Sequence, residues 1–175
     1  MSKQKRFCIF GAGAIGGLIA FKLSKAGYHV SIIARGPHLR AIRENGITLK
    51  SAEKIEKIPV DTFEADDVLP DIDYLFITLK AHSIPSVVKS ISRLVQEKTT
   101  IVYGVNGVPH WYFYGLNNQY GNKNINAVDP NGVLTKHLPP NKIIGTVIYP
   151  ACEIIEPGVI QHLEGNRISL GEPKG

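Results

Sequence analysis

Three glycines, Gly11, Gly13 and Gly16, form the pattern G-x-G-x-x-G directly after the apolar run of residues 6–10. The run ends abruptly at glycine, which is typical of a buried strand. Apolar side chains then recur at helical spacing over residues 14–25, which predicts an amphipathic helix. A strand, a glycine-rich turn and a helix in this order are the context in which the pattern binds a dinucleotide. The alternative, a glycine-rich turn without a ligand, is disfavoured by this context.

Each of the three glycines has a separate physical purpose in such a site. Gly11 permits the tight turn, Gly13 lets the backbone approach a pyrophosphate, and Gly16 lets helix and strand pack closely. The free N–H groups at the start of the helix, and the helix dipole, then face the phosphates. The coenzyme-binding loop that we predict consists of Gly11, Ala12, Gly13, Ala14, Ile15 and Gly16.

The residues after the second predicted strand indicate which dinucleotide would bind. About 20 residues past the glycines, an NAD site places Asp or Glu to bind the ribose 2′-hydroxyl. This sequence has Arg35 there and no carboxylate until Glu44. A guanidinium pairs with a 2′-phosphate through two parallel hydrogen bonds. We therefore predict NADP over NAD, with Arg35 as the discriminating group and Arg40 as a weaker helper. The alternative is that Arg35 is a solvated surface charge.

Short β-branched runs alternate with helical segments through the first part of the chain. The sequence predicts further strands at 28–34, 73–78 and 100–103, helices at 37–44 and 83–95, and a small strand pair at 47–49 and 55–60. This alternation predicts an α/β fold of the Rossmann type: a doubly wound, mostly parallel sheet with crossover helices.

The last third of the chain has a different pattern. Turn residues separate short apolar runs, which we expect to be antiparallel strands that finish or flank the sheet. These predicted strands are 143–149, 151–155, 159–163 and 167–170. Residues 117–142 are rich in Asn, Gly and Pro, and the sequence determines their structure least.

Composition limits the class of protein. A length of 175 residues, 43% of them hydrophobic, suits one globular domain over residues 1–175. No apolar run approaches the roughly 20 residues of a membrane span, and the N-terminus lacks the pattern of a signal peptide. Cys8, expected in the core, and Cys152 form neither a disulfide framework nor a metal site, so we expect the cytoplasm and no bound metal. The net charge of +5 suits an anionic small ligand as well as nucleic acid.

Several short motifs, in their order and positions, make the chain resemble the N-terminal half of ketopantoate reductases (2-dehydropantoate 2-reductases). They are the glycine loop, Arg35, Thr78-Leu-Lys80-Ala81-His82, Val105-Asn106-Gly107 and the run from Pro157 to Pro173. The resemblance extends from about Arg6 to the last residue. It implies a Rossmann domain that binds NADPH, and an enzyme that reduces ketopantoate to pantoate on the way to pantothenate and coenzyme A.

The resemblance also implies roles for three residues. Lys80 would lie near the ribose of the coenzyme and the substrate carboxylate, Asn106 would bind the nicotinamide ribose or a substrate oxygen, and Ala151 would contact the coenzyme through its backbone. The second domain of the family is largely helical and carries the lysine proton donor. Because the chain stops at the expected hinge, residues 171–175, we expect NADPH binding but very weak or no turnover from the chain alone.

The residues themselves support these positions for Lys80 and Asn106. Each follows a predicted apolar strand, and ligands of open α/β sheets bind outside the carboxyl ends of the strands. The alternatives are a surface lysine at a helix start and an Asn-Gly turn that binds nothing. We assign no catalytic role to the isolated His82, His110 and His162.

The aromatic group at residues 111–114 is expected to serve core or interface packing, and it departs from the commonest form of the family. Its position after Asn106 leaves a different 2-oxo acid open as the small-molecule substrate. A stand-alone module that senses NADP is a further alternative, and a homodimer stays open as the assembly. We expect no membrane partner and no nucleic acid, because the basic residues show no recognition-helix or aromatic-stripe pattern.

Overall fold

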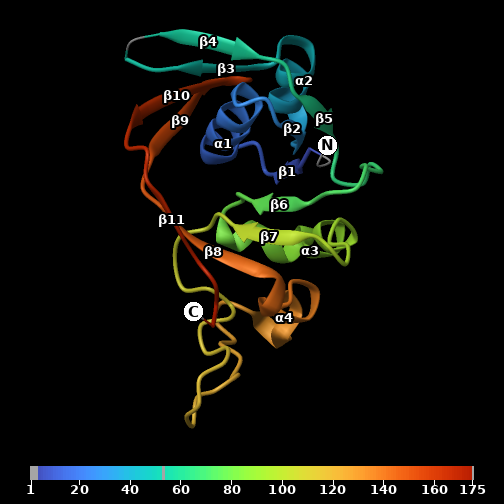
Figure 1. Ribbon diagram of the computed structural model, residues 1–175, viewed down its shortest axis with the longest axis vertical. Coiled ribbons are helices and arrows are strands. Elements are labelled where there is room, and N and C mark those ends of the chain that lie inside the picture. Colours follow the sequence, from blue (N-terminus) through green and yellow to red (C-terminus); the bar gives the residue numbers. More distant parts are fainter. Residues whose placement is uncertain (1–3, 53, 175) are drawn as a thin grey trace.

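A computed structural model describes residues 4–52 and 54–174, so the predicted domain and its terminal hinge include a few positions outside the described residues. The described part contains a seven-stranded sheet in the order β11-β8-β7-β6-β1-β2-β5. Figure 1 shows the middle of this sheet running down the molecule from β2 through β1, β6 and β7 to β8. Its strands are β1 (Arg6–Phe10), β2 (His29–Ile33), β5 (Asp61–Phe63), β6 (Tyr74–Ile77), β7 (Thr100–Tyr103), β8 (Ile143–Ile148) and β11 (Ile168–Gly171).

Helices pack on both faces of this sheet. They are α1 (Ala14–Lys25), α2 (Gly36–Asn45), α3 (Ile84–Arg93) and the short α4 (Val133–His137). Along β1, Ile9 joins the core on the side of α1 and α2, whereas Cys8 and Phe10 join the core on the side of α3 and α4. This alternation follows from the two-residue period of a strand, and it explains why β1 is apolar from Phe7 to Phe10. None of the described helices is long and apolar enough to cross a membrane.

The predicted α/β fold with a doubly wound sheet is confirmed. From β1 the chain adds β2 and then β5 on one side, and it crosses over to add β6, β7 and β8 on the other. All these strands are parallel, and β11 runs antiparallel to β8. The prediction of Cys8 as a core residue is also confirmed, and burial raises the pKa of its thiol to about 12.

The prediction for the last third of the chain is partly wrong. Strand β8 was expected to be antiparallel, but it pairs in parallel with β7 and only its other neighbour, β11, is antiparallel. The Pro-Gly and Gly-Asn turns indicate hairpins between later strands, but they carry no information on how the first of these strands meets β7. Strand β5 and helix α4, which are three and five residues long, were not predicted from the sequence.

A second sheet covers the outer side of α1, and only the joining of its two predicted strand pairs was not expected. Its order is β4-β3-β10-β9, formed by β3 (Ile47–Lys50), β4 (Ile55–Ile58), β9 (Ala151–Glu156) and β10 (Val159–Glu164). The β3–β4 and β9–β10 pairs are antiparallel, as the sequence predicts, and β10 joins the two pairs by lying parallel to β3. Figure 1 shows this sheet at the upper end of the molecule, beside α1.

The chain between β7 and α4 extends from the lower end of the sheet without regular strands (Figure 1). In the aromatic group at residues 111–114, Trp111 packs against the core, in line with the packing role predicted, whereas Tyr112 is exposed. His110 is buried next to them, with its ring against those of Tyr103 and Trp111. Its Nε2 lies 3.1 Å from the carbonyl oxygen of Leu138, which can only accept, so the proton resides on Nε2.

The neutral ring of His110 predicts that stability falls in mild acid. Burial lowers the pKa of His110, because the charged ring would lose its hydration and a proton added to the enclosed Nδ1 would find no acceptor among the described residues. His110 therefore takes up a proton near pH 6.5 in the unfolded chain, but only at lower pH in the folded chain. The contribution of the neutral ring to the free energy of unfolding is fully present above pH 6.5. Below it we expect the free energy of unfolding to fall by up to about 1.4 kcal/mol per pH unit from this group.

Urea titrations at several pH values between 5 and 8 measure this slope. The variant His110→Phe should have a shallower slope over the same range, whereas a matched change at the exposed His82, His82→Phe, should keep it. An unchanged slope in His110→Phe would show that this ring does not control stability in acid.

Candidate functional site

The carboxyl ends of the central strands meet in register at one edge of the large sheet. Ile33 of β2 pairs with Phe10 of β1, which pairs with Ile77 of β6, which in turn pairs with Tyr103 of β7. The chain reverses its direction of strand addition between β1 and β6, and open α/β sheets bind ligands at this switch point. Four predicted site segments follow these strand ends along the edge: Arg35 after β2, the glycine loop after β1, Lys80 after β6 and Asn106 after β7.

The glycine loop is fixed to both neighbouring strands. The N–H of Gly11 donates to the carbonyl oxygen of Ile33 (3.0 Å), and the hydroxyl of Thr78 donates to the carbonyl oxygen of Gly11 (2.6 Å). Gly11 has a φ of +105°, a conformation that favours glycine. A Cβ on Gly16 would lie 2.1 Å from the oxygen of Gly11, so the start of α1 can approach the end of β1 only without a side chain there.

Gly13 differs from its neighbours because a Cβ on it would meet no heavy atom within 4 Å. It is the residue directly before α1, whose first N–H groups have no partner within the helix. The first turn of α1 contains no acidic side chain. The loop therefore presents an open surface of N–H groups and the positive end of a helix dipole, which suit a diphosphate.

Arg35 lies at the start of α2, two residues past the paired end of β2. Its side chain is exposed and forms no ion pair with any residue that the structure describes. Arg40 is exposed on the same helix. A guanidinium in this position, just past the end of the strand that pairs with β1, is available to an anionic ligand.

Lys80 and Asn106 differ in how they are held. Lys80 is exposed, precedes a 3₁₀ turn at Ala81–Ser83 and has no ion-pair partner within the described ranges. The Asn106 amide instead pairs with the backbone of Ile148, donating to its carbonyl oxygen and accepting from its N–H, each at 2.9 Å. Asn106 therefore fastens the end of β7 to the end of β8, and one N–H of its amide stays available.

Ala151 begins β9, three residues after Ile148, and is half-buried. The structure thus places the predicted residues at the carboxyl ends of the central strands, except Ala151, which begins a strand of the second sheet. Hydrogen bonds connect the segments in two groups. Thr78 joins the glycine loop to the end of β6, and Asn106 joins the end of β7 to the end of β8, from which the chain continues to Ala151.

Two side chains that contact the backbone of the glycine loop were not predicted from the sequence. The hydroxyl of Thr78 is one of them, and His38, whose Nε2 lies 2.7 Å from the carbonyl oxygen of Ala12, is the other. His38 is half-buried in the first turn of α2, three residues after Arg35. Its closeness to Arg35 in the sequence is the only signal that could have suggested it.

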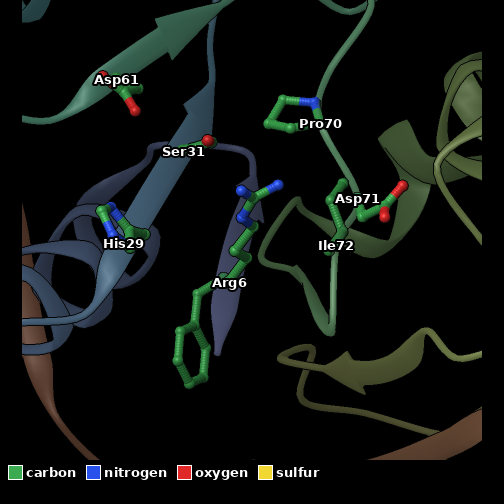
Figure 2. A pocket seen from close by; sticks show the side chains of 8 residues that line it. Arg6, His29, Ser31, Asp61, Pro70, Asp71 and Ile72 are labelled. Carbon is green, nitrogen blue, oxygen red and sulfur yellow. The ribbon is translucent and has the colours of Figure 1, made fainter. Parts of the chain in front are cut away.

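A small hollow lies at the opposite edge of the sheet, where the strands begin. Figure 2 shows the side chain of Arg6 extending into it between Ser31 and Asp71. Its lining comprises Arg6, Phe7, His29, Ser31, Asp61, Pro70, Asp71 and Ile72. Because these residues stand at the amino ends of β1, β2, β5 and β6, the hollow is separate from the edge that carries the glycine loop.

Comparisons with known proteins give matches over most of the chain. Residues 7–112 match the family described as ketopantoate reductase PanE/ApbA. A 2-dehydropantoate 2-reductase of Mesorhizobium japonicum is 44% identical over 171 residues, which are 97% of this chain and 52% of that protein. One from Aquifex aeolicus is 27% identical over 97% of this chain and 47% of its own length.

Solved structures show the same fold. A crystal structure from Ralstonia solanacearum, provisionally described as a ketopantoate reductase, superimposes with a TM-score of 0.91 at 33% identity, covering 99% of this chain and 54% of that one. A D-mandelate dehydrogenase solved with NADH and anilino(oxo)acetate has a TM-score of 0.76 at 19% identity, over 95% of this chain and 48% of its own, which is a likeness of fold alone. The chain therefore spans about half the length of these relatives.

Proposed function

Because the chain belongs to the ketopantoate reductase (PanE/ApbA) family, we propose that it is the coenzyme-binding half of an NADPH-dependent enzyme that reduces ketopantoate to pantoate. The observation that carries the proposal is an open glycine loop at the switch point together with the guanidinium of Arg35, which forms no ion pair with the residues that the structure describes. The open space at Gly13 is what the close approach of a diphosphate requires. We propose the cytoplasm as its location, as expected from the sequence.

When bound, the nicotinamide would supply a hydride to the 2-oxo carbon. The N–H groups of the glycine loop would hold the diphosphate, and Arg35 would pair with the 2′-phosphate of the adenosine. Lys80 would attract the carboxylate of the substrate, because its ammonium is exposed and unpaired within the described part of the chain. Asn106 would orient a ribose hydroxyl or a substrate oxygen through the N–H that Ile148 does not use.

A reductase of another 2-oxo acid is the second candidate, and one observation favours it. A hollow beside the Asn106 loop is lined by Val105, Gly107 and Trp111 on one side and by β8 and β11 on the other. Trp111 belongs to the aromatic group that departs from the commonest form of the family, so this hollow would select the group attached to the oxo carbon. Within this proposal, the 175 residues bind the coenzyme and reduce ketopantoate weakly or not at all by themselves.

The variant Arg35→Asp tests the preference for NADPH. A carboxylate in place of the guanidinium would repel a 2′-phosphate and accept hydrogen bonds from a 2′-hydroxyl. We expect the ratio of the NADPH and NADH affinities to shift by about 100-fold toward NADH, since hydrogen bonds to charged groups contribute about 1.5–3 kcal/mol each. Fluorescence titration of each coenzyme measures both affinities.

The matched control is Arg43→Asp, which makes the same change of charge at the other end of α2. It should alter the ratio of the two affinities by less than about threefold, because exposed charges more than a Debye length apart are screened. If Arg35→Asp kept the wild-type preference for NADPH, Arg35 would be only a solvated surface charge.

A further inference from the structure

One imidazole lies between the glycine loop and a distant turn of the second sheet. The Nε2 of His38 is 2.7 Å from the carbonyl oxygen of Ala12, and the N–H of Gly158 donates to the Nδ1 of His38 at 3.0 Å. Gly158 forms the turn between β9 and β10, 120 residues further along the chain. His38 itself lies in the first turn of α2, close to Arg35. The ring therefore contacts the coenzyme loop, α2 and the second sheet together.

These two contacts fix the tautomer of the ring. A backbone N–H can only donate, so the Nδ1 that receives the hydrogen of Gly158 must carry a lone pair. A carbonyl oxygen can only accept, so the Nε2 facing Ala12 must carry the hydrogen. The neutral ring protonated on Nε2 satisfies both partners, and the other neutral tautomer satisfies neither.

The bond to Ala12 determines which way the next peptide group faces. In a trans peptide the carbonyl of one residue and the N–H of the next point in opposite directions. Because the oxygen of Ala12 is turned to His38, the N–H of Gly13 is turned away from it. Within the loop, Gly13 is the glycine at which a Cβ would meet no heavy atom within 4 Å. Rotation of this peptide would instead turn a carbonyl dipole toward the ligand and repel the diphosphate.

Gly158, the second hydrogen-bond partner of His38, is itself held in place by its neighbours. Gly158 is buried with a φ of +79°, and its carbonyl oxygen accepts the N–H of Thr48 in β3 at 2.9 Å. A Cβ on Gly158 would approach the Cβ of Ala41 in α2 to 3.3 Å. The β9–β10 turn therefore packs closely on α2. Its hydrogen bond to Nδ1 turns the Nε2 of His38 toward the carbonyl oxygen of Ala12.

We propose that His38 is a positioning residue for the dinucleotide: it holds the Ala12–Gly13 peptide so that its N–H faces the diphosphate. The inference rests on the proposed function, because the ligand in question is the coenzyme. It adds that the second sheet takes part in coenzyme binding, through Gly158 and this ring. The two hydrogen bonds of His38 go to backbone groups of Ala12 and Gly158, so its proposed effect on the coenzyme is indirect.

Two substitutions separate the positioning role from simple packing. His38→Phe keeps a ring but removes both hydrogen bonds, and we expect about tenfold weaker binding of NADPH in fluorescence titration, a change of about 1.4 kcal/mol. His38→Gln keeps one donor and one acceptor on a flexible side chain, and we expect affinity within about threefold of wild type. The matched control His29→Phe, at the amino end of β2, should bind NADPH as the wild type does. Thermal unfolding of each variant checks that it is folded.

Nitrogen NMR of the imidazole in the wild-type chain gives a second readout that does not depend on any variant folding. We expect His38 to be protonated on Nε2 and not on Nδ1, and we expect the amide resonance of Gly13 to shift when NADPH is added. Protonation on Nδ1, or a folded His38→Phe that binds NADPH as tightly as wild type, would overturn the inference and leave the proposed function intact. Failure of the wild-type chain to bind NADPH would remove the proposed function itself.

Discussion

Replacing Gly16 with alanine is expected to destabilise the fold by about 3 kcal/mol and to abolish coenzyme binding with it. The new Cβ would lie 2.1 Å from the carbonyl oxygen of Gly11 and 2.5 Å from the hydroxyl oxygen of Thr78. The first of these atoms is backbone, and it is held in place because Gly11 bonds to Ile33 and Thr78. Neither can move without breaking the link between β1 and β6 at the switch point.

The neighbouring Gly17 provides a matched control. A Cβ there would lie 1.8 Å from the Cδ1 of Ile160, which is buried, but this atom is the far end of a side chain and can shift at lower cost than backbone. Alanine has a higher helix propensity than glycine by about 1 kcal/mol, and both positions lie in α1, so this gain is common to both variants. Urea unfolding should therefore show a loss for Gly17→Ala that is smaller by about 2 kcal/mol. Equal stability of the two variants would mean that the contact of α1 with Gly11 does not limit the fold.

The parts of the fold that could be predicted have strong local patterns. Strand β1 and helix α1 agree with their predicted bounds, because an apolar run, a glycine turn and a helical period follow one another without a gap. The three residues of β5 are too few to form a pattern, so its pairing with β2 depends on the sheet already being present. The join of β10 to β3 links segments about 110 residues apart, and no local signal encodes such a pairing.

The same distinction applies to the site. Arg35 and Lys80 could be placed at the carboxyl edge because each directly follows a strand whose direction the sequence determines. The partners of Asn106 and His38 could not be predicted, because they are backbone groups of Ile148 and Gly158, 42 and 120 residues away. Such contacts depend on where whole segments pack. The roles of these residues in coenzyme binding stay predictions, which the proposed variants test.

The largest effect on binding without a loss of stability is expected at Gly13. Its φ of −63° and ψ of −170° are accessible to any residue, and a Cβ would meet no heavy atom within 4 Å. Gly13→Val should therefore change the free energy of unfolding by less than about 1 kcal/mol. The two added methyl groups would occupy the space that a diphosphate needs, so we expect the affinity for NADPH to fall by about 100-fold or more.

The opposite outcomes at Gly13 and Gly16 distinguish a ligand site from a packing site within one loop. At Gly16 the space that a Cβ would need is occupied by atoms of Gly11 and Thr78. At Gly13 this space is empty, on the side where the coenzyme would lie. The variant Gly171→Val is the control, because this glycine also has open space around its Cβ direction but lies in β11, away from the loop. It should bind NADPH with wild-type affinity. If Gly13→Val also did so, the diphosphate could not lie against the start of α1, and the open space at Gly13 would have no connection with a dinucleotide.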